Sequence, residues 1–185
     1  MSLQDTVTKQ YVSDPKVFAD AFNYLIYDGE QVIRPEQLTD LDATQFAIPY
    51  REEEEGKPEA TQKYRDVLKT LAVKTDDQRA YLVLGIENQS NVHYAMPVRN
   101  MLYDAMQYEK QVRQLAAAHR KKHDAATSDE YLSGMSREDK ITPVITLVIN
   151  FGSKRWDGPL SLYEMMPEQP AKVKAFVQDY KVFLI

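Results

Sequence analysis

The sequence predicts an α/β domain in which a mixed β-sheet is flanked by helices. Three observations support this class: amphipathic helical segments at 15–27 and 96–118, two strands rich in Val, Leu and Tyr around a polar turn within 64–89, and a continuous apolar run at 141–151. Helix, hairpin, helix and strand follow one another in this order, which is typical of a sheet covered by helices.

Composition restricts the kind of protein. A chain of 185 residues is long enough for one domain with a sizeable core. It has no cysteine, which excludes disulfides and thiolate metal sites. No apolar run approaches the roughly 20 residues of a membrane span, so we expect a soluble, cytoplasmic protein with no membrane partner. The net charge of −5 disfavours a protein that coats nucleic acid, although a bound metal supplies positive charge locally.

The N-terminal part of the chain predicts one helix and a short strand. Residues 1–14 are polar and are expected to form a flexible N-terminus, and 15–185 a single domain. Ser13 or Asp14 followed by Pro15 favours a helix start, and Asp28-Gly29 favours its end. A short strand is expected at 31–34, and the acidic run 52–55 is expected to be a solvated loop.

The hairpin is the most informative stretch. A turn centred on Asp76-Asp77 places Asp66 directly opposite Glu87, with Cβ atoms about 4.5–5.5 Å apart. Strand alternation places Gln89 on the same face as Glu87. Two facing carboxylates repel unless a cation lies between them or one is protonated. This register therefore predicts an oxygen-ligand site for a hard cation such as Mg²⁺ or Mn²⁺.

A long helix and further strands complete the prediction. Apolar residues recur at spacings of three and four from Met96-Pro97 onward and predict one buried stripe: Val98, Met101, Ala105, Tyr108, Val112 and Leu115. The basic run 119–123 has two interpretations, cations that stabilise a helix C-terminus or a patch that contacts phosphate. A buried strand is expected at 141–151, a short helix at 160–166 and a final strand at 180–185.

Three segments carry a resemblance to a known family: FADAFNYLIYDGEQVI, YLVLGIENQS and MPVRNMLYDAMQYEKQV. Together they resemble the bacterial Rpn family of recombination-promoting nucleases, also described as putative transposases. An acid on one strand, then an acid-x-polar triplet and a helix, is similar to the PD-(D/E)XK core of restriction-endonuclease-like folds. The resemblance covers about residues 17–151. It implies a divalent-metal-dependent DNA endonuclease linked to recombination or mobile-element activity, with DNA as partner, homodimers as one possible form, and a largely helical region beyond residue 185.

The resemblance also implies roles for individual residues. Asp66 and Glu87 would bind Mg²⁺ (or Mn²⁺ or Ca²⁺), together with the backbone carbonyl of Asn88. Gln89 stands where the superfamily core usually has Lys, and Gln can only orient the attacking water by a hydrogen bond. The first helix of this fold often contributes a supporting acid, for which Asp20 is the candidate.

Contacts to DNA are expected from Arg99, near the start of the long helix, and from Lys121 and Lys122. Asp20 has an alternative interpretation as a solvent-facing charge, and Arg99 as part of a polar helix surface stacked on Tyr103. Two other functions stay open: a non-catalytic DNA-binding module on a nuclease fold, and a protein-interaction or regulatory domain. Hydrolases with a Ser or Cys nucleophile are disfavoured because the chain has no Cys and no Gly-x-Ser-x-Gly motif.

Overall fold

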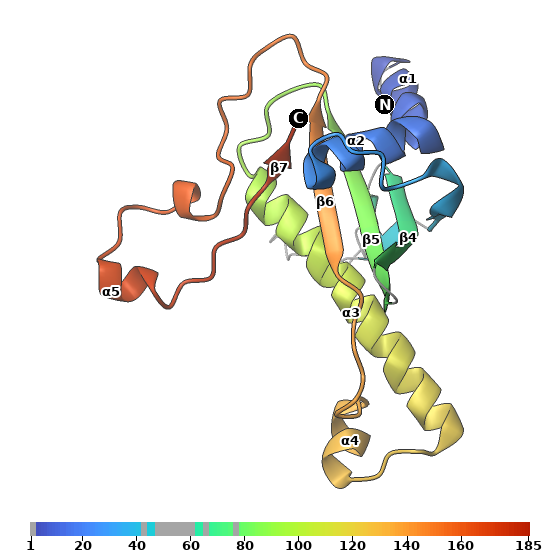
Figure 1. Cartoon of the computed structure of the whole chain (residues 1–185). Helices are drawn as coiled ribbons and strands as arrows, with labels where there is room; N and C mark the ends of the chain where they lie inside the picture. Colours follow the sequence, from blue (N-terminus) through green and yellow to red (C-terminus); the bar gives the residue numbers. More distant parts are fainter. Residues whose placement is uncertain (1–2, 42–43, 47–61, 65–66, 76–77) are drawn as a thin grey trace, which may run out of the picture.

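The computed structural model describes residues 3–41, 44–46, 62–64, 67–75 and 78–185 (Figure 1). Its main sheet has five strands in the order β1-β4-β5-β6-β7. The strands are β1 (Leu38–Asp40), β4 (Val67–Thr75), β5 (Gln78–Gln89), β6 (Val144–Asn150) and β7 (Phe183–Leu184). Pairing is antiparallel from β1 to β5 and parallel from β5 to β7. The predicted mixed sheet is confirmed. A separate antiparallel pair is formed by β2 (Thr44–Phe46) and β3 (Gln62–Tyr64).

The register of the central hairpin is the one that the sequence predicted. Val67 lies opposite Ile86, and Thr75 lies opposite Gln78 at the turn. The turn residues Asp76-Asp77 and the predicted ligand Asp66 lie outside the described residues.

Two N-terminal helices cover one face of the sheet. Helix α2 (Pro15–Tyr27) begins as predicted, because Asp14 Oδ1 accepts a hydrogen bond from the Lys16 backbone N–H at 2.8 Å. It ends at Asp28, whose φ of 51° is left-handed. Helix α1 (Leu3–Ser13) precedes it where no helix was expected, and its Val12 is fully buried. Apolar side chains from both helices pack on those of the sheet: Val12, Phe18, Ala19 and Phe22 on Val67, Leu84, Ile86 and Leu147.

Helix α3 (Met96–Lys122) crosses the other face and continues beyond the sheet towards α4 (Ser128–Ser133) (Figure 1). Its orientation contradicts the predicted apolar stripe, since Val98 and Met101 are 42% and 38% exposed. The face turned towards the sheet is largely polar and includes Asn100, Asp104 and Gln107. The reason is that the sheet offers polar partners on this face, so that polar side chains are accommodated beneath the helix.

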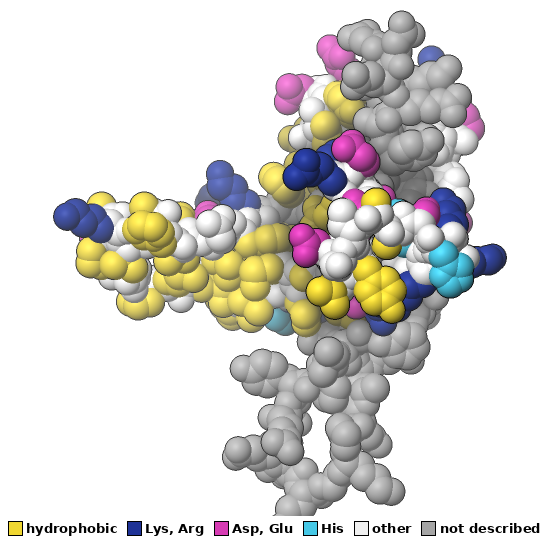
Figure 2. All heavy atoms as spheres, turned by 90° about the horizontal axis from the view of Figure 1, so that it is seen from below, with side chains coloured by type: hydrophobic (Ala, Val, Ile, Leu, Met, Phe, Trp, Pro, Cys, Tyr) yellow, Lys and Arg dark blue, Asp and Glu magenta, His cyan; other side chains and the backbone are white. Residues whose placement is uncertain are grey.

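The segment between β6 and β7 projects away from the sheet (Figure 1). It contains the 3₁₀-helix η2 (Tyr163–Met165), within the predicted helix 160–166, and the short helix α5 (Ala171–Lys174). Hydrophobic side chains cover much of this projection (Figure 2), and Phe176 is 87% exposed. Another 3₁₀-helix, η1 (Pro35–Gln37), leads into β1. Within the described ranges, no helix is both long and apolar enough to cross a membrane.

Candidate functional site

Glu87 is a buried acid on strand β5 of the sheet. Its neighbours in sequence, Ile86 and Asn88, point towards α1 and α2, and strand alternation turns Glu87 towards α3. The carboxylate is 0% exposed, and in the sheet Glu87 lies beside Val148 of β6. Burial of a charged carboxylate is costly unless a cation or hydrogen-bond donors accompany it. An ionised Glu87 therefore requires a cation or hydrogen-bond donors next to it.

Arg99 supplies a positive charge from the first turns of α3. Its Nη2 lies 3.1 Å from Glu87 Oε2. The guanidinium carbon also lies 5.6 Å from the centroid of the Tyr103 ring, a cation–π distance. The Arg99 side chain is 33% exposed, so it connects the buried carboxylate to the surface. The stack on Tyr103 considered from the sequence is present, and the contact with Glu87 accompanies it.

The buried face of α3 forms a polar layer over the sheet. Thr146 Oγ1 of β6 donates a hydrogen bond to Asp104 Oδ1 at 2.6 Å, and the Tyr180 hydroxyl donates to Asp104 Oδ2. Asn100 is 0% exposed, and within the described part of the chain neither its Oδ1 nor its Nδ2 has a hydrogen-bond partner. Gln107 Nε2 is also buried and has no hydrogen-bond partner among the described residues. Buried amides without partners indicate a place for water or a bound ion.

His93 lies between β5 and α3. Its Nδ1 is buried and has no hydrogen-bond partner among the described residues. Burial, and then the positive charge of Arg99, lower the pKa of His93, so the imidazole is neutral at pH 7. A neutral imidazole can accept a proton. No sequence pattern reveals the relation of His93 to Arg99, because this relation depends on how α3 packs.

Of the other predicted site residues of the hairpin, only Gln89 is described on the same face as Glu87. Gln89 is half-buried and shares the face of Glu87 by alternation. The Asn88 side chain points to the opposite face and donates a hydrogen bond to Thr8 Oγ1 of α1. The metal role predicted for Asn88 concerns its carbonyl and stays a prediction, as does that of Asp66, which lies outside the described residues.

Asp20 lies away from Glu87. It is exposed on α2, which covers the opposite face of the sheet, and its Oδ1 accepts a hydrogen bond from Gln31 Nε2 at 3.1 Å. It lines an open cavity of about 460 Å³ with Tyr11 and Lys16. Its supporting role in metal binding stays a prediction that this arrangement does not favour.

Lys121 and Lys122 lie at the far end of α3, exposed in its last turn. At about 1.5 Å per residue, Lys121 is roughly 33 Å further along the helix axis than Arg99. The two lysines therefore do not belong to the immediate surroundings of Glu87. Only a ligand that extends over this distance could contact the two lysines and Arg99 at the same time.

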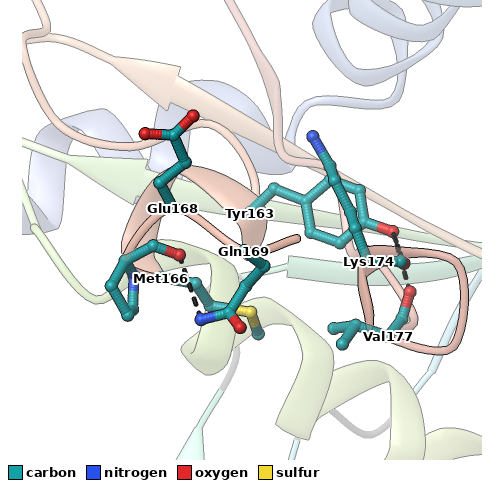
Figure 3. A pocket seen from close by; sticks show the side chains of 7 residues that line it. Tyr163, Met166, Glu168, Gln169, Lys174 and Val177 are labelled. Carbon is teal, nitrogen blue, oxygen red and sulfur yellow. Dashed lines mark hydrogen bonds between the residues drawn. The ribbon is translucent and has the colours of Figure 1, made fainter. Parts of the chain in front are cut away.

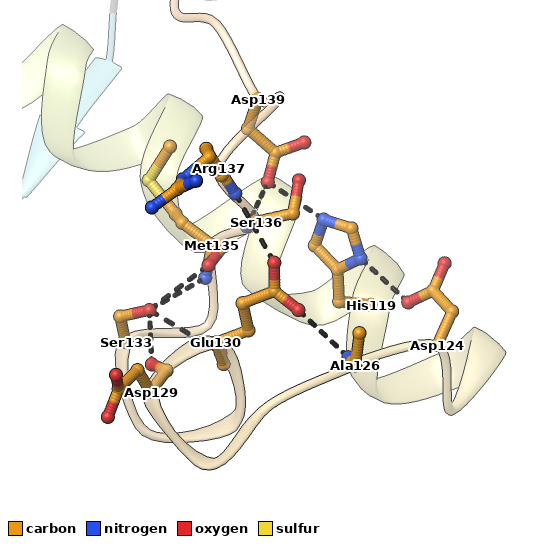
Figure 4. Close-up of polar contacts among 10 residues, drawn as sticks. All are labelled: His119, Asp124, Ala126, Asp129, Glu130, Ser133, Met135, Ser136, Arg137 and Asp139. Atoms are coloured by element: carbon orange, nitrogen blue, oxygen red, sulfur yellow. Dashed lines mark hydrogen bonds and ion pairs between the residues drawn. The ribbon is translucent and has the colours of Figure 1, made fainter.

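Next to these lysines, His119 is held by two carboxylates (Figure 4). Its Nδ1 lies 2.7 Å from Asp124 Oδ1, and its Nε2 lies 2.8 Å from Asp139 Oδ2. The hydrogen bond with Asp124 and then that with Asp139 raise the pKa of His119. This residue of the basic run thus ties the α4 segment to the end of α3.

A second cavity lies in the segment that projects from the sheet (Figure 3). It measures about 180 Å³ and is lined by Tyr163, Met166, Pro167, Glu168, Gln169, Lys174 and Val177. The Tyr163 hydroxyl donates a hydrogen bond to the Val177 carbonyl at 2.8 Å, and the Lys174 ammonium lies 4.6 Å from the Tyr163 ring centroid. These contacts fix the position of the Tyr163 ring at one side of the cavity.

The polar layer beneath α3 has oxygen donors that suit a hard cation. Glu87 offers a buried carboxylate and Asn100 a buried amide oxygen. Mg²⁺ is commonly bound through one or two carboxylates and retains several water molecules. Within the described ranges, no three acidic or histidine side chains form a cluster that could hold a metal. The described donors alone therefore do not form a metal site, and Asp66, the other predicted carboxylate ligand, lies outside the described residues.

Comparison with known proteins identifies no relative: no family model, no curated protein and no solved structure matches this chain.

Proposed function

We propose that this chain is a divalent-metal-dependent DNA endonuclease of the PD-(D/E)XK type. The observation that carries the proposal is a fully buried acid, Glu87, at the end of the second hairpin strand. The strand register agrees with the one from which the sequence predicted Asp66 opposite Glu87. Burial of an acid in a polar layer is a feature of functional sites, because it costs stability unless a ligand or charge compensates it.

The residues have distinct tasks in this proposal. Glu87 would hold the cation, together with Asp66 and the backbone carbonyl of Asn88 as predicted from the sequence. When bound, a divalent cation would neutralise phosphate charge and lower the pKa of a coordinated water. Arg99 would bind a phosphate oxygen of the scissile group, for which its planar fork of donors is suited.

Two neutral side chains, His93 and Gln89, would act on the attacking water in this proposal. His93, neutral at pH 7, can accept the proton that the attacking water loses. Gln89 can orient that water through its side-chain carbonyl and cannot remove its proton. Its role is therefore a positioning role, and the general base is assigned to His93 within this proposal.

A second candidate is a DNA-binding module without catalysis. The contact of Arg99 with Glu87 at 3.1 Å favours it, because a guanidinium already neutralises the acid that would hold the metal. Such a module would bind DNA in EDTA and would leave it intact when Mg²⁺ or Mn²⁺ is added.

The test is nicking of supercoiled plasmid DNA in Mg²⁺ and in Mn²⁺. We expect the wild type to nick the plasmid and Glu87→Gln to lose at least a hundredfold in rate, since the variant keeps the shape of the side chain but loses its charge. Glu109→Gln is the matched control on α3, because the Glu109 side chain is 55% exposed and pairs with Arg113. DNA binding without nicking by the wild type would support the second candidate, and equal nicking by Glu87→Gln would refute the assigned site.

A further inference from the structure

The segment between β6 and β7 leaves the sheet and returns to it, and residues 160–177 of this segment are named the arm (Figure 1). We infer that the arm is a dimerisation surface, which pairs with the arm of a second copy of this chain about a two-fold axis. Such a dimer is independent of the proposed nuclease function.

The arm is braced by its own hydrogen bonds. Its outgoing and returning legs run antiparallel, and the Leu162 backbone N–H donates to the Tyr180 carbonyl at 3.1 Å where they leave the sheet. Further out, the Tyr163 hydroxyl donates to the Val177 carbonyl at 2.8 Å and so joins the two legs again. A surface that is already ordered loses little conformational entropy when it binds a partner.

The side chains that point outwards from the arm include many apolar ones (Figure 2). Phe176 is 87% exposed, which leaves on the order of 150 Å² of its surface in solvent. Four more apolar side chains of the arm are between 36% and 46% exposed: Leu160, Met165, Met166 and Val173. Together they expose roughly a few hundred Å², a patch size that marks interaction sites on soluble proteins.

The charges of the arm favour a second copy as the partner. The outgoing leg has the exposed acids Glu164 and Glu168, and the returning leg has the exposed bases Lys172 and Lys174. A two-fold axis along the arm places the outgoing leg of one copy against the returning leg of the other, so that acids face bases twice. This self-complementarity is what a two-fold interface requires. A lipid surface is disfavoured, because the acids would face anionic headgroups.

The size of the arm sets the expected affinity. Two arms in contact would bury less than about 1,200 Å² in total, which is typical of weak and reversible complexes. We therefore expect a dissociation constant of about 1–100 µM. Phe176 is the expected centre of the interface, since aromatic side chains that become fully buried contribute most to binding.

The experiment is sedimentation equilibrium of the 185-residue chain at about 1–300 µM. We expect a monomer–dimer equilibrium for the wild type, and at least a tenfold higher dissociation constant for Phe176→Asp. Leu132→Asp is the matched control, because Leu132 of α4 is 80% exposed and lies outside the arm. It receives the same charge and should dimerise like the wild type. A wild type that stays monomeric, or equal dissociation constants for the two variants, would overturn the inference.

A charge exchange tests the direction of the two-fold axis. It uses Glu168 and Lys172, because Glu164 and Lys174 have contacts within the arm. Glu168→Lys or Lys172→Glu alone should weaken the dimer several-fold, and the two changes together should restore it. A double variant that is weaker than both single ones would overturn the axis along the arm. Co-sedimentation of a monomeric wild type with phosphatidylcholine–phosphatidylserine vesicles would overturn the dimer and assign the arm to a lipid surface.

Discussion

The ion pair between Glu87 and Arg99 allows a quantitative prediction about stability. At an effective dielectric constant of about 20, unit charges about 3 Å apart attract with about 5 kcal/mol, and desolvation cancels part of this gain. Loss of one partner of a buried pair costs about 3–5 kcal/mol. Because a third of the Arg99 side chain is exposed, we expect the lower half of that range for Arg99→Gln, about 3 kcal/mol.

The assay is a double-mutant cycle by urea unfolding in EDTA, with Glu87→Gln, Arg99→Gln and both changes together. The coupling energy should be about 2–3 kcal/mol. The variant Arg99→Gln leaves the buried charge of Glu87 without a partner, whereas the double variant has two neutral amides at these positions and leaves no such charge. The control cycle uses Glu109 and Arg113, whose atoms are closer, at 2.6 Å, but whose side chains are 55% and 70% exposed. Its coupling should stay below about 0.5 kcal/mol.

The comparison of the two cycles tests the reasoning directly, because burial and distance predict opposite rankings. If the Glu87–Arg99 coupling is no larger than the Glu109–Arg113 coupling, burial does not strengthen the pair. The claim that Glu87 depends on a cation would then fail.

Two further predictions concern the end of α3. His119→Gln should destabilise the protein most between about pH 4 and 6.5. The pKa of His119 is raised in the folded state, so its stabilising effect is complete below the unfolded pKa of 6.5 and is lost as the pH rises through the folded pKa. Its partners Asp124 and Asp139, whose pKa values are lowered, are ionised above about pH 4. Urea midpoints at pH 5.5 and pH 9 measure this, and an equal deficit at both would contradict it. Gly134→Ala should cost about 2–4 kcal/mol, because φ is +72° and a Cβ would lie 2.5 Å from Ala116 Cβ. Gly29→Ala, with φ of +90° and no atom within 4 Å, should cost only about 1–2 kcal/mol in the same thermal unfolding assay, and equal costs would exclude the contact with Ala116 as the cause.

The parts of the fold that local rules govern could be predicted from the sequence. The hairpin register follows from the position of a two-residue turn, and Val67 lies opposite Ile86 as that turn requires. Helix α2 begins at Pro15 because Asp14 caps it, and it ends where Asp28 becomes left-handed. Each of these features depends on residues that are close in sequence or symmetric about one turn.

The orientation of α3 could not be predicted in this way. Its apolar residues follow a helical period, and yet Val98 and Met101 face solvent, while Asp104 is buried. The partners of Asp104 are Thr146 and Tyr180, which lie more than forty residues away in the sequence. A buried polar face becomes favourable only when such distant donors are in place, and no periodicity within the helix reveals them.

The same limit applies to the candidate site. Sequence reasoning identified Glu87 and Arg99 separately, one through strand register and the other through its place near the helix start. Their contact at 3.1 Å depends on the packing of α3 on the sheet, as does the burial of Asn100. Asp20 was selected because the first helix of the resembled fold often contributes an acid, and Lys121 because it stands in a basic run. The fold places Asp20 on the opposite face of the sheet and Lys121 at the far end of α3.

The most direct test of the central claim is calorimetric titration with Mn²⁺ of the wild type, Glu87→Gln and the control Glu109→Gln. If Glu87 is the core of a metal site, the wild type and Glu109→Gln will bind Mn²⁺ equally, and Glu87→Gln will lose the binding. Equal binding by all three proteins, or no binding by the wild type, would contradict the claim.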